Sequence, residues 1–165
     1  AINVDAHLDM REANQPHSGT PYRMLLEQNF LCPENLHEVG TQPQANSPRY
    51  LEQARAMGVH VHTLARMASK GVARYLDELF ESIANRPLFA GLDMDSICAA
   101  DAPGVSAPSP VGLSGRDVLL FADHCFRHSE TAVFEITETN PEMDIDDRTA
   151  KLAALATYTF LYGWA

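Results

Sequence analysis

The sequence has few cysteines and little positive charge. Its 165 residues include three cysteines, Cys32, Cys98 and Cys125, which are widely spaced and form no C-x-x-C pair. This pattern argues against a zinc or redox motif and predicts a reduced, cytoplasmic protein. Lys and Arg number 12 against 22 Asp and Glu, so the formal charge is −10. Because nucleic acids and anionic membranes are bound mainly through basic patches, neither is an expected partner, and cationic or metal ligands fit better.

The sequence also lacks an apolar run long enough to cross a membrane. The most apolar stretch, Leu152–Trp164, is shorter than the ~18 residues that a span requires and contains Thr157 and Gly163, so it predicts a core helix. A length of 165 residues corresponds to about one domain. The chain begins at Ala1 without an initiator Met or a cleavable signal, and we expect a start that is cut rather than natural.

Short apolar runs alternate with amphipathic stretches, which is typical of repeated β-α units on a mostly parallel sheet. The expected strands are Ala1–Val4, Leu36–Thr41, Val59–Leu64, Leu88–Leu92 and Ala132–Thr137. Apolar residues recur at helical spacing in five further stretches. These expected helices are Thr20–Asn29, Ser47–Met57, Ser69–Ala84, Ser114–Arg127 and Asp146–Tyr162.

Local signals mark two helix starts and one long connection. Ser114 is expected to cap one helix, and Asp146 or Asp147 the last one. The segment Ala99–Gly112 holds three prolines and two glycines without periodicity. A structured loop of this length is usually functional, the alternative being a surface excursion. We favour a functional loop because it closely follows the strand that ends at Asp93.

Acidic side chains follow two of the expected strands. The first strand leads into Asp5, His7 and Asp9, and the fourth into Asp93 and Asp95, and in an extended chain this alternation points them to one side. Ligands of parallel α/β sheets bind beyond the carboxyl ends of the strands. One such motif alone equally fits a solvated strand end or a helix cap. Two motifs favour metal, because four converging carboxylates repel one another and two divalent cations cancel their charge.

The donor set indicates which metal and which chemistry. Oxygen-rich ligation with one or two imidazoles and no thiolate favours manganese, with iron, cobalt or magnesium as alternatives, over a structural zinc. Two metals bridged by carboxylates also hold a water and lower its pKa. The expected chemistry is therefore metal-assisted hydrolysis.

Three segments resemble signatures of the arginase/agmatinase ureohydrolase superfamily, in the same order: Val4–Asp9, Gly91–Asp95 and Glu138–Pro141. The resemblance covers essentially the whole chain. It implies a three-layer α/β/α sandwich with a central, mostly parallel sheet and two Mn2+ ions in the site. It also implies that Glu138 lies near the reacting carbon and orients the amidine nitrogens.

The same resemblance implies a role for each ligand. Asp5 and Asp93 would bridge both metals, while His7 and Asp95 would complete one metal site. Asp9 would serve the other and hydrogen-bond the hydroxide. Family domains are longer and carry a further metal-ligating His upstream, so we expect residues 1–165 to be a single ureohydrolase-type domain that lacks its N-terminal part. Family members commonly assemble, so a homo-oligomer is expected.

Three other segments resemble formimidoylglutamases in particular: His17–Pro21, Ala102–Pro110 and Thr149–Ala153. Arginases and agmatinases tend to carry a Gly-Thr-Gly-Thr-Pro form of the second segment. The implied reaction converts N-formimidoyl-L-glutamate and water to L-glutamate and formamide, as in histidine degradation. Two alternatives remain: a guanidine hydrolase of the agmatinase or arginase type that releases urea, and a non-catalytic truncated family member.

A substrate with two carboxylates requires cations or hydroxyl donors in its pocket. Arg11 lies two residues beyond Asp9, and its guanidinium could form a forked pair with a substrate carboxylate; the alternative is an ion pair with Glu12. His17 could pass a proton to the leaving amine, as a His in the corresponding loop is thought to do in arginases. Alternatively, Ser18 occupies the position in this loop that corresponds to the arginase His, and it would then bind substrate.

The remaining candidates are interpreted as structural. Arg23 is expected to pair with Glu27 four residues away on a helix. His60 and His62 fit hydrogen-bonded histidines at a strand end, and His124 and His128 fit a polar helix face rather than a zinc pair. The acidic residues Asp144, Asp146 and Asp147 are explained by helix capping rather than by a calcium loop.

Overall fold

Five parallel strands form the centre of the chain, whose computed structural model describes residues 1–164. The strands are β1 (Ile2–Val4), β2 (His37–Thr41), β3 (His60–Thr63), β4 (Leu88–Asp93) and β5 (Thr131–Thr137). They lie in the order β3-β2-β1-β4-β5, and every pairing between neighbours is parallel. Each expected strand is present within two residues of its expected ends, which confirms the α/β interpretation.

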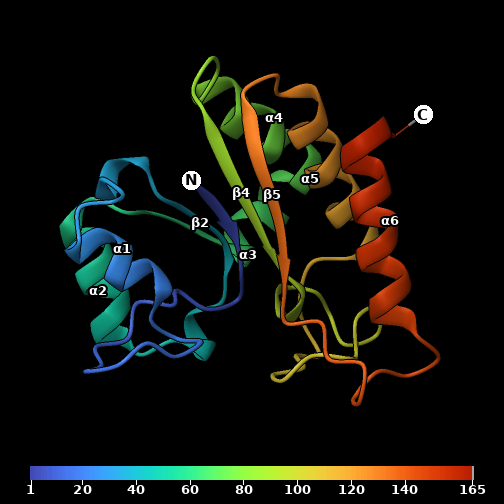
Figure 1. Ribbon diagram of the computed structural model, residues 1–165, viewed down its shortest axis with the longest axis horizontal. Helices are drawn as coiled ribbons and strands as arrows, with labels where there is room; N and C mark the ends of the chain where they lie inside the picture. The colour runs from blue at the N-terminus through green and yellow to red at the C-terminus, as the bar shows by residue number, and fades with distance from the viewer. Residues whose placement is uncertain (165) are drawn as a thin grey trace.

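Helices cover both faces of this sheet. The helices are α1 (Pro21–Glu27), α2 (Pro48–Met57), α3 (Leu64–Lys70), α4 (Val72–Ser82), α5 (Gly115–Arg127) and α6 (Arg148–Tyr162). Short 3₁₀ turns occur at η1 (Pro33–Asn35), η2 (Pro43–Ala45) and η3 (Met94–Ser96). Figure 1 shows α1 and α2 on one side of the strands and α4, α5 and α6 on the other. The arrangement confirms the expected three-layer α/β/α sandwich.

Alternation along the strands divides the apolar residues between two cores. Ile2 and Val4 belong to the larger core beneath α3, α4, α5 and α6, and Tyr22 and Leu26 of α1 belong to the smaller core shared with α2. Asn3 points to the α1 side. On that side β4 and β5 are less covered, since Phe89 is 37% and Val133 45% exposed. Within residues 1–164, the outer edge of β5 pairs with no further strand.

The expected helix at Ser69–Ala84 is wrong in detail, because Gly71 divides it. Gly71 has φ +86, a conformation that ends α3 and begins α4. Helix α3 also begins where the sequence predicted the end of a strand, at Leu64. Its N-cap is Thr63, whose hydroxyl accepts from the Arg66 amide at 3.4 Å.

The last helix differs from its expectation in two ways. Asp147 occupies the N-cap position, but its side chain makes no capping hydrogen bond. Asp144, another of the acidic residues interpreted as capping groups, accepts the backbone N–H groups of Thr149 and Ala150 at 3.1 and 3.0 Å. The helix is also not a core helix throughout, because one face is largely exposed. Large exposed side chains on this face are Leu155, Tyr158, Leu161 and Tyr162. None of the helices described in residues 1–164 has the length and apolar character that a membrane crossing requires.

Three histidines stack at the start of β2 and β3. The rings of His37 and His60 lie 4.6 Å apart, and His37 Nδ1 lies 3.1 Å from His62 Nε2. His62 Nδ1 in turn lies 2.7 Å from the Tyr75 hydroxyl, and His60 Nε2 lies 3.2 Å from the Glu34 carbonyl. The structure thus supports the interpretation of His60 and His62 as hydrogen-bonded strand-end histidines. Burial, followed by the neighbouring His60, lowers the pKa of His37 to about 3 and that of His62 to about 4.

We predict that the histidine stack contributes to acid sensitivity. An unfolded chain protonates histidine near pH 6.5, whereas folded His37 and His62 stay neutral down to about pH 3 and 4. Between these values the unfolded state binds more protons, so the free energy of unfolding falls as the pH decreases; the contribution is complete above pH 6.5. Urea unfolding between pH 7.5 and 5 should show a shallower loss for His62→Gln than for the unsubstituted chain. Equal losses would contradict this prediction.

Candidate metal centre

The pairing of β1 with β4 brings the two aspartate motifs together. Val4 is in register with Leu92, so the next residues along the chain, Asp5 and Asp93, leave the sheet side by side. Both carboxylates are buried, with exposed fractions of 2% and 7%. The structure therefore places the motifs at the shared carboxyl edge that the sequence predicted.

The chain beyond each strand turns, and the expectation of an extended alternation is wrong. The Asp5 carboxylate accepts the backbone N–H of His7 at 2.7 Å, and the Asp93 carboxylate accepts that of Asp95 at 2.8 Å. Aspartate favours such turns because its short side chain can bond to the backbone two residues on. At Asp9 the backbone has φ 49, in the left-handed region. These turns, rather than strand pleating, aim the side chains at a common centre.

The tightest part of the cluster consists of Asp5, His7 and Asp95. Their ligand atoms all lie within 4.8 Å of one another. His7 Nδ1 lies 3.0 Å from Asp95 Oδ2 and 3.4 Å from Asp5 Oδ1. Asp95 Oδ1 is buried without a hydrogen-bond partner among the described residues. A buried, unpartnered carboxylate oxygen is costly, so this donor set fits a cation that the oxygen could ligate.

Protonation equilibria at the cluster reflect the crowding of its charges. Burial and the charge of Asp5 raise the pKa of Asp93 to about 8 and that of Asp9 to about 7, and burial also raises the pKa of Asp5. Hydrogen bonds to Asp5 and then Asp95 raise the pKa of His7 to about 10. Metal ligands must give up their protons, so cation binding here is expected to release protons.

A cleft of about 170 Å³ opens over the cluster. The predicted residues that line it are Asp5, His7, Asp9, Arg11, Ser18, Asp93, Asp95 and Glu138. His17 is not among its lining residues; its exposed ring accepts the Gly19 amide through Nδ1 at 3.1 Å. Except for His17, the structure therefore brings the sequence-predicted site residues to one cleft.

Arg11 lies along the wall of this cleft. Its backbone N–H donates to the Gly19 carbonyl at 2.9 Å, and a Cβ at Gly19 would lie only 2.8 Å from Arg11 Cδ. The alternative pairing of Arg11 with Glu12 is not what the structure shows. Glu12 instead pairs with Arg49 at 2.8 Å and with Arg23 at 3.4 Å. The Arg11 guanidinium can therefore face the cleft.

The long loop expected at Ala99–Gly112 supplies another wall. Ser106 donates from Oγ to Glu138 Oε2 at 2.5 Å. The loop is held in place where the Gly104 N–H donates to Thr149 Oγ1 at 2.7 Å. A Cβ at Gly104 would lie 2.6 Å from that of Asp144, so only glycine permits this approach. This placement favours the interpretation of the loop as functional.

The sequence did not indicate which side chains hold the site residues. Two of them at the β5 side of the cleft are Ser106, which bonds to Glu138, and Thr137, whose hydroxyl donates to Asp93 Oδ2 at 3.0 Å. Thr137 immediately precedes Glu138, a position that could have drawn attention to it. The contact itself depends on the pairing of β4 with β5, where Thr137 is in register with Asp93.

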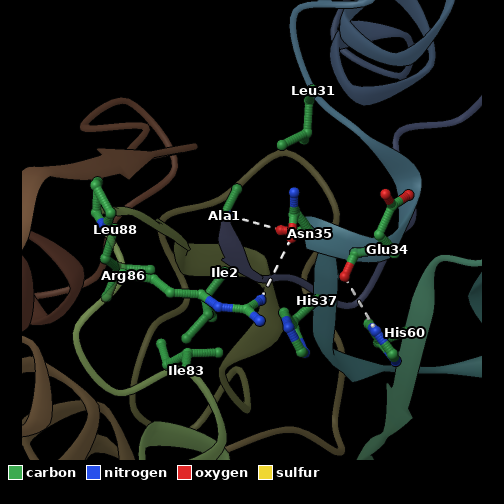
Figure 2. A pocket seen from close by; sticks show the side chains of 11 residues that line it. Ala1, Ile2, Leu31, Glu34, Asn35, His37, His60, Ile83, Arg86 and Leu88 are labelled. Atoms are coloured by element: carbon green, nitrogen blue, oxygen red, sulfur yellow. Dashed lines mark hydrogen bonds between the residues drawn. The ribbon is translucent and has the colours of Figure 1, made fainter.

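A larger cavity of about 810 Å³ lies at the opposite, amino end of the strands. Figure 2 shows its polar groups paired with one another: the Ala1 amino group with the Asn35 carbonyl at 2.6 Å, and Arg86 with Asn35 Oδ1 at 3.5 Å. His60 contacts the Glu34 carbonyl in the same view. These polar groups are bonded to neighbouring protein groups, so size alone does not identify the site.

The other candidates have separate structural partners. Arg23 Nε lies 2.5 Å from Glu27 Oε1, as the sequence predicted. His124 Nε2 lies 3.0 Å from an Asp77 oxygen, and His128 Nε2 lies 2.9 Å from the Arg86 carbonyl. His124 in α5 and His128 at its C-cap therefore face different partners, as expected for a polar helix face.

Comparisons with known proteins agree with this geometry. The formimidoylglutamase of Halalkalibacterium halodurans is 32% identical over 166 residues, covering 98% of this chain and 52% of that protein. The proclavaminate amidinohydrolase of Streptomyces clavuligerus is 30% identical over 167 residues, covering 99% and 53%. The crystal structure of Trypanosoma cruzi formiminoglutamase with Mn2+ has a TM-score of 0.92 at 29% identity, covering 98% and 55%. The chain thus spans about half the length of the proteins it matches.

The family assignment is broader than any single relative. The sequence profile described as the arginase family matches residues 1–163, which is nearly the entire chain. The chain belongs to the arginase family.

Proposed function

We propose that this chain carries the metal-binding part of a manganese-dependent amidine hydrolase, and that the enzyme is a formimidoylglutamase. It would convert N-formimidoyl-L-glutamate and water to L-glutamate and formamide. The observation that carries the proposal is the cluster of buried Asp5 and Asp95 with half-buried His7, and its unpartnered Asp95 oxygen. Support comes from formimidoylglutamases among the relatives, one of them solved with Mn2+.

The family resemblance supplies the ligand assignment, and the placement of the carboxylates is compatible with it. Asp5 and Asp93, side by side at the strand ends, would bind both metals. His7 and Asp95 would complete one manganese site, and Asp9 would serve the second. When bound, two manganese ions supply a hydroxide nucleophile near neutral pH, because they lower the pKa of water.

Residues around the cleft bind and orient the substrate. Glu138, fixed by Ser106, is assigned to the amidine nitrogens, where its charge would stabilise the positive charge that develops. Asp9 accepts a hydrogen bond from the attacking water. Arg11 pairs with a substrate carboxylate, and Ser18 donates a hydrogen bond. His17 remains a candidate for passing a proton to the leaving amine, because its Nδ1 is engaged with Gly19 and Nε2 is left for the transfer.

The working enzyme is proposed to be larger than this chain. The chain covers about half of its relatives, and β5 offers an unpaired outer edge within the described residues. A further part of the domain could extend the sheet there and supply the additional imidazole that the resemblance implies. We place the enzyme in the cytoplasm, because its free cysteines suit a reduced compartment. The proposed substrate places it in histidine degradation. Assembly into a homo-oligomer is proposed from the family resemblance.

A guanidine hydrolase that releases urea is the second candidate, favoured by the similarity to an amidinohydrolase. Turnover of formimidoylglutamate and agmatine, measured side by side with manganese, separates the two candidates. Glutamate release without urea supports the first, and urea release selects the second. Turnover of neither substrate would favour a non-catalytic member.

We predict that Asp93→Asn removes metal and turnover together. Asn keeps the shape of Asp93 but removes the charge of a bridging ligand. Residues that only orient ligands change metal affinity about 10–100-fold, so loss of a ligand should cost at least about 100-fold. Bound manganese and glutamate release are the measurements. Asp147→Asn is the matched control because Asp147 is exposed and Asn tolerates its left-handed backbone. An Asp93→Asn protein that keeps both properties would refute the metal assignment.

A second prediction concerns Arg11. A hydrogen bond to a charged group contributes about 1.5–3 kcal/mol, so Arg11→Met should raise KM for formimidoylglutamate about 10–150-fold. Arg11→Lys should recover part of this loss, because Lys keeps the charge but not the forked geometry. Arg49→Met is the control, since Arg49 contacts Glu12 outside the cleft. An unchanged KM in Arg11→Met would show that the substrate carboxylates bind elsewhere.

A further inference from the structure

Glu38 occupies an unusual position in the middle of β2. Its side chain is 0% exposed, and its Oε1 has no hydrogen-bond partner among the described residues. Burial raises the pKa of this carboxyl well above its usual range. A buried polar atom without a partner is destabilising, so Glu38 is a poor choice for stability alone.

The other Glu38 oxygen connects to Asp5 through Asn3. Parallel register sets Asn3 of β1 beside Glu38, and Asn3 Nδ2 donates to Glu38 Oε2 at 2.9 Å. The same NH₂ group lies 3.3 Å from Asp5 Oδ2. An amide nitrogen carries two hydrogens, so it can serve both acceptors at once.

Asp5 is thereby held through both of its oxygens. The backbone N–H of His7 binds Oδ1 at 2.7 Å, and Asn3 approaches Oδ2 from inside the sheet. A carboxylate tied in this way cannot rotate freely, and the outward-facing lone pairs keep a fixed direction.

Strand β4, the other neighbour of β1, leaves space for the Asn3 amide. Gly91 of β4 is in register with Asn3. A Cβ at Gly91 would lie 3.2 Å from Asn3 Oδ1 and 3.2 Å from the Tyr22 hydroxyl oxygen. Alanine at this position would therefore have to displace the amide by a few tenths of an ångström.

We propose that Glu38 is a positioning residue for the metal centre: by accepting one hydrogen of Asn3, it directs the other to Asp5 and fixes that ligand's carboxylate. This inference rests on the proposed metal function. Glu38 itself touches neither metal nor substrate. Its oxygen is needed as an acceptor, and an amide oxygen can replace it.

The test compares Glu38→Met, Glu38→Gln and Asn3→Leu in the whole chain. Two readouts are needed: the Mn2+ dissociation constant, from electron paramagnetic resonance of unbound Mn2+, and the melting temperature without metal. We expect Glu38→Met to weaken Mn2+ binding about 10–100-fold without lowering the melting temperature, and Glu38→Gln to bind like the unsubstituted chain. Asn3→Leu should weaken Mn2+ binding to the same extent but lower the melting temperature, because it leaves the buried Glu38 carboxyl without a partner. Glu135→Met is the control, because Glu135 lies on the same sheet face at exposed β5.

Several outcomes would overturn the inference. A lower melting temperature with unchanged Mn2+ affinity assigns Glu38 a structural role, and weak binding by Glu38→Gln excludes the acceptor role. If Glu38→Met does not fold, Gly91→Ala decides: displacement of the amide should weaken Mn2+ binding, and unchanged affinity refutes the proposal. Failure of the unsubstituted protein to bind Mn2+ even when it includes the further part of the domain would overturn the metal function too, whereas equal binding by all variants removes only the role of Glu38.

Discussion

Repulsion among buried carboxylates is the constraint on which the site depends. In-register pairing of β1 and β4 places Asp5 beside Asp93, and both are nearly removed from water. The pKa of each carboxyl is raised, so neutrality requires protons or cations. Hydrogen-bond donors in the surrounding structure also stabilise the two carboxylates. Backbone N–H groups, Thr137 and Asn3 together donate to all four oxygens of these two carboxylates.

The elements around the site hold residues in uncommon conformations. Asp9 has φ 49 and Glu138 has φ 61, both in the left-handed region that side chains other than glycine rarely adopt. Such conformations persist only where neighbours fix them, and they cluster at functional sites. Glu138 is fixed by Ser106, and the turn after Asp9 is fixed where Arg23 N–H donates to the Asp9 carbonyl at 3.3 Å.

A structural feature can be predicted from the sequence when the residues that determine it are close together in the chain. Strands were predicted well because short apolar runs between helical patterns are a local signal, and the Asp5 and Asp93 motifs lie directly at their ends. The Gly71 break was not predicted. Capping of the last helix by the acidic residues before it was predicted, but not that Asp144 supplies the hydrogen bonds. The link from Glu38 to Asp5 needs the register of β1 and β2, and the contact between Ser106 and Glu138 needs the folded loop; neither follows from spacing along the chain.

The edge of β5 has a consequence for the behaviour of the chain in concentrated solution. Along that edge, backbone N–H and C=O groups face outward without a partner strand in residues 1–164, and Val133 beside them is exposed. Edges of this kind act as templates for strands of other molecules. The single acidic side chain of the strand, Glu135, and the net charge of −10 oppose such growth by repulsion. Added salt screens that repulsion, so the tendency of the chain to self-associate through this edge should rise with ionic strength.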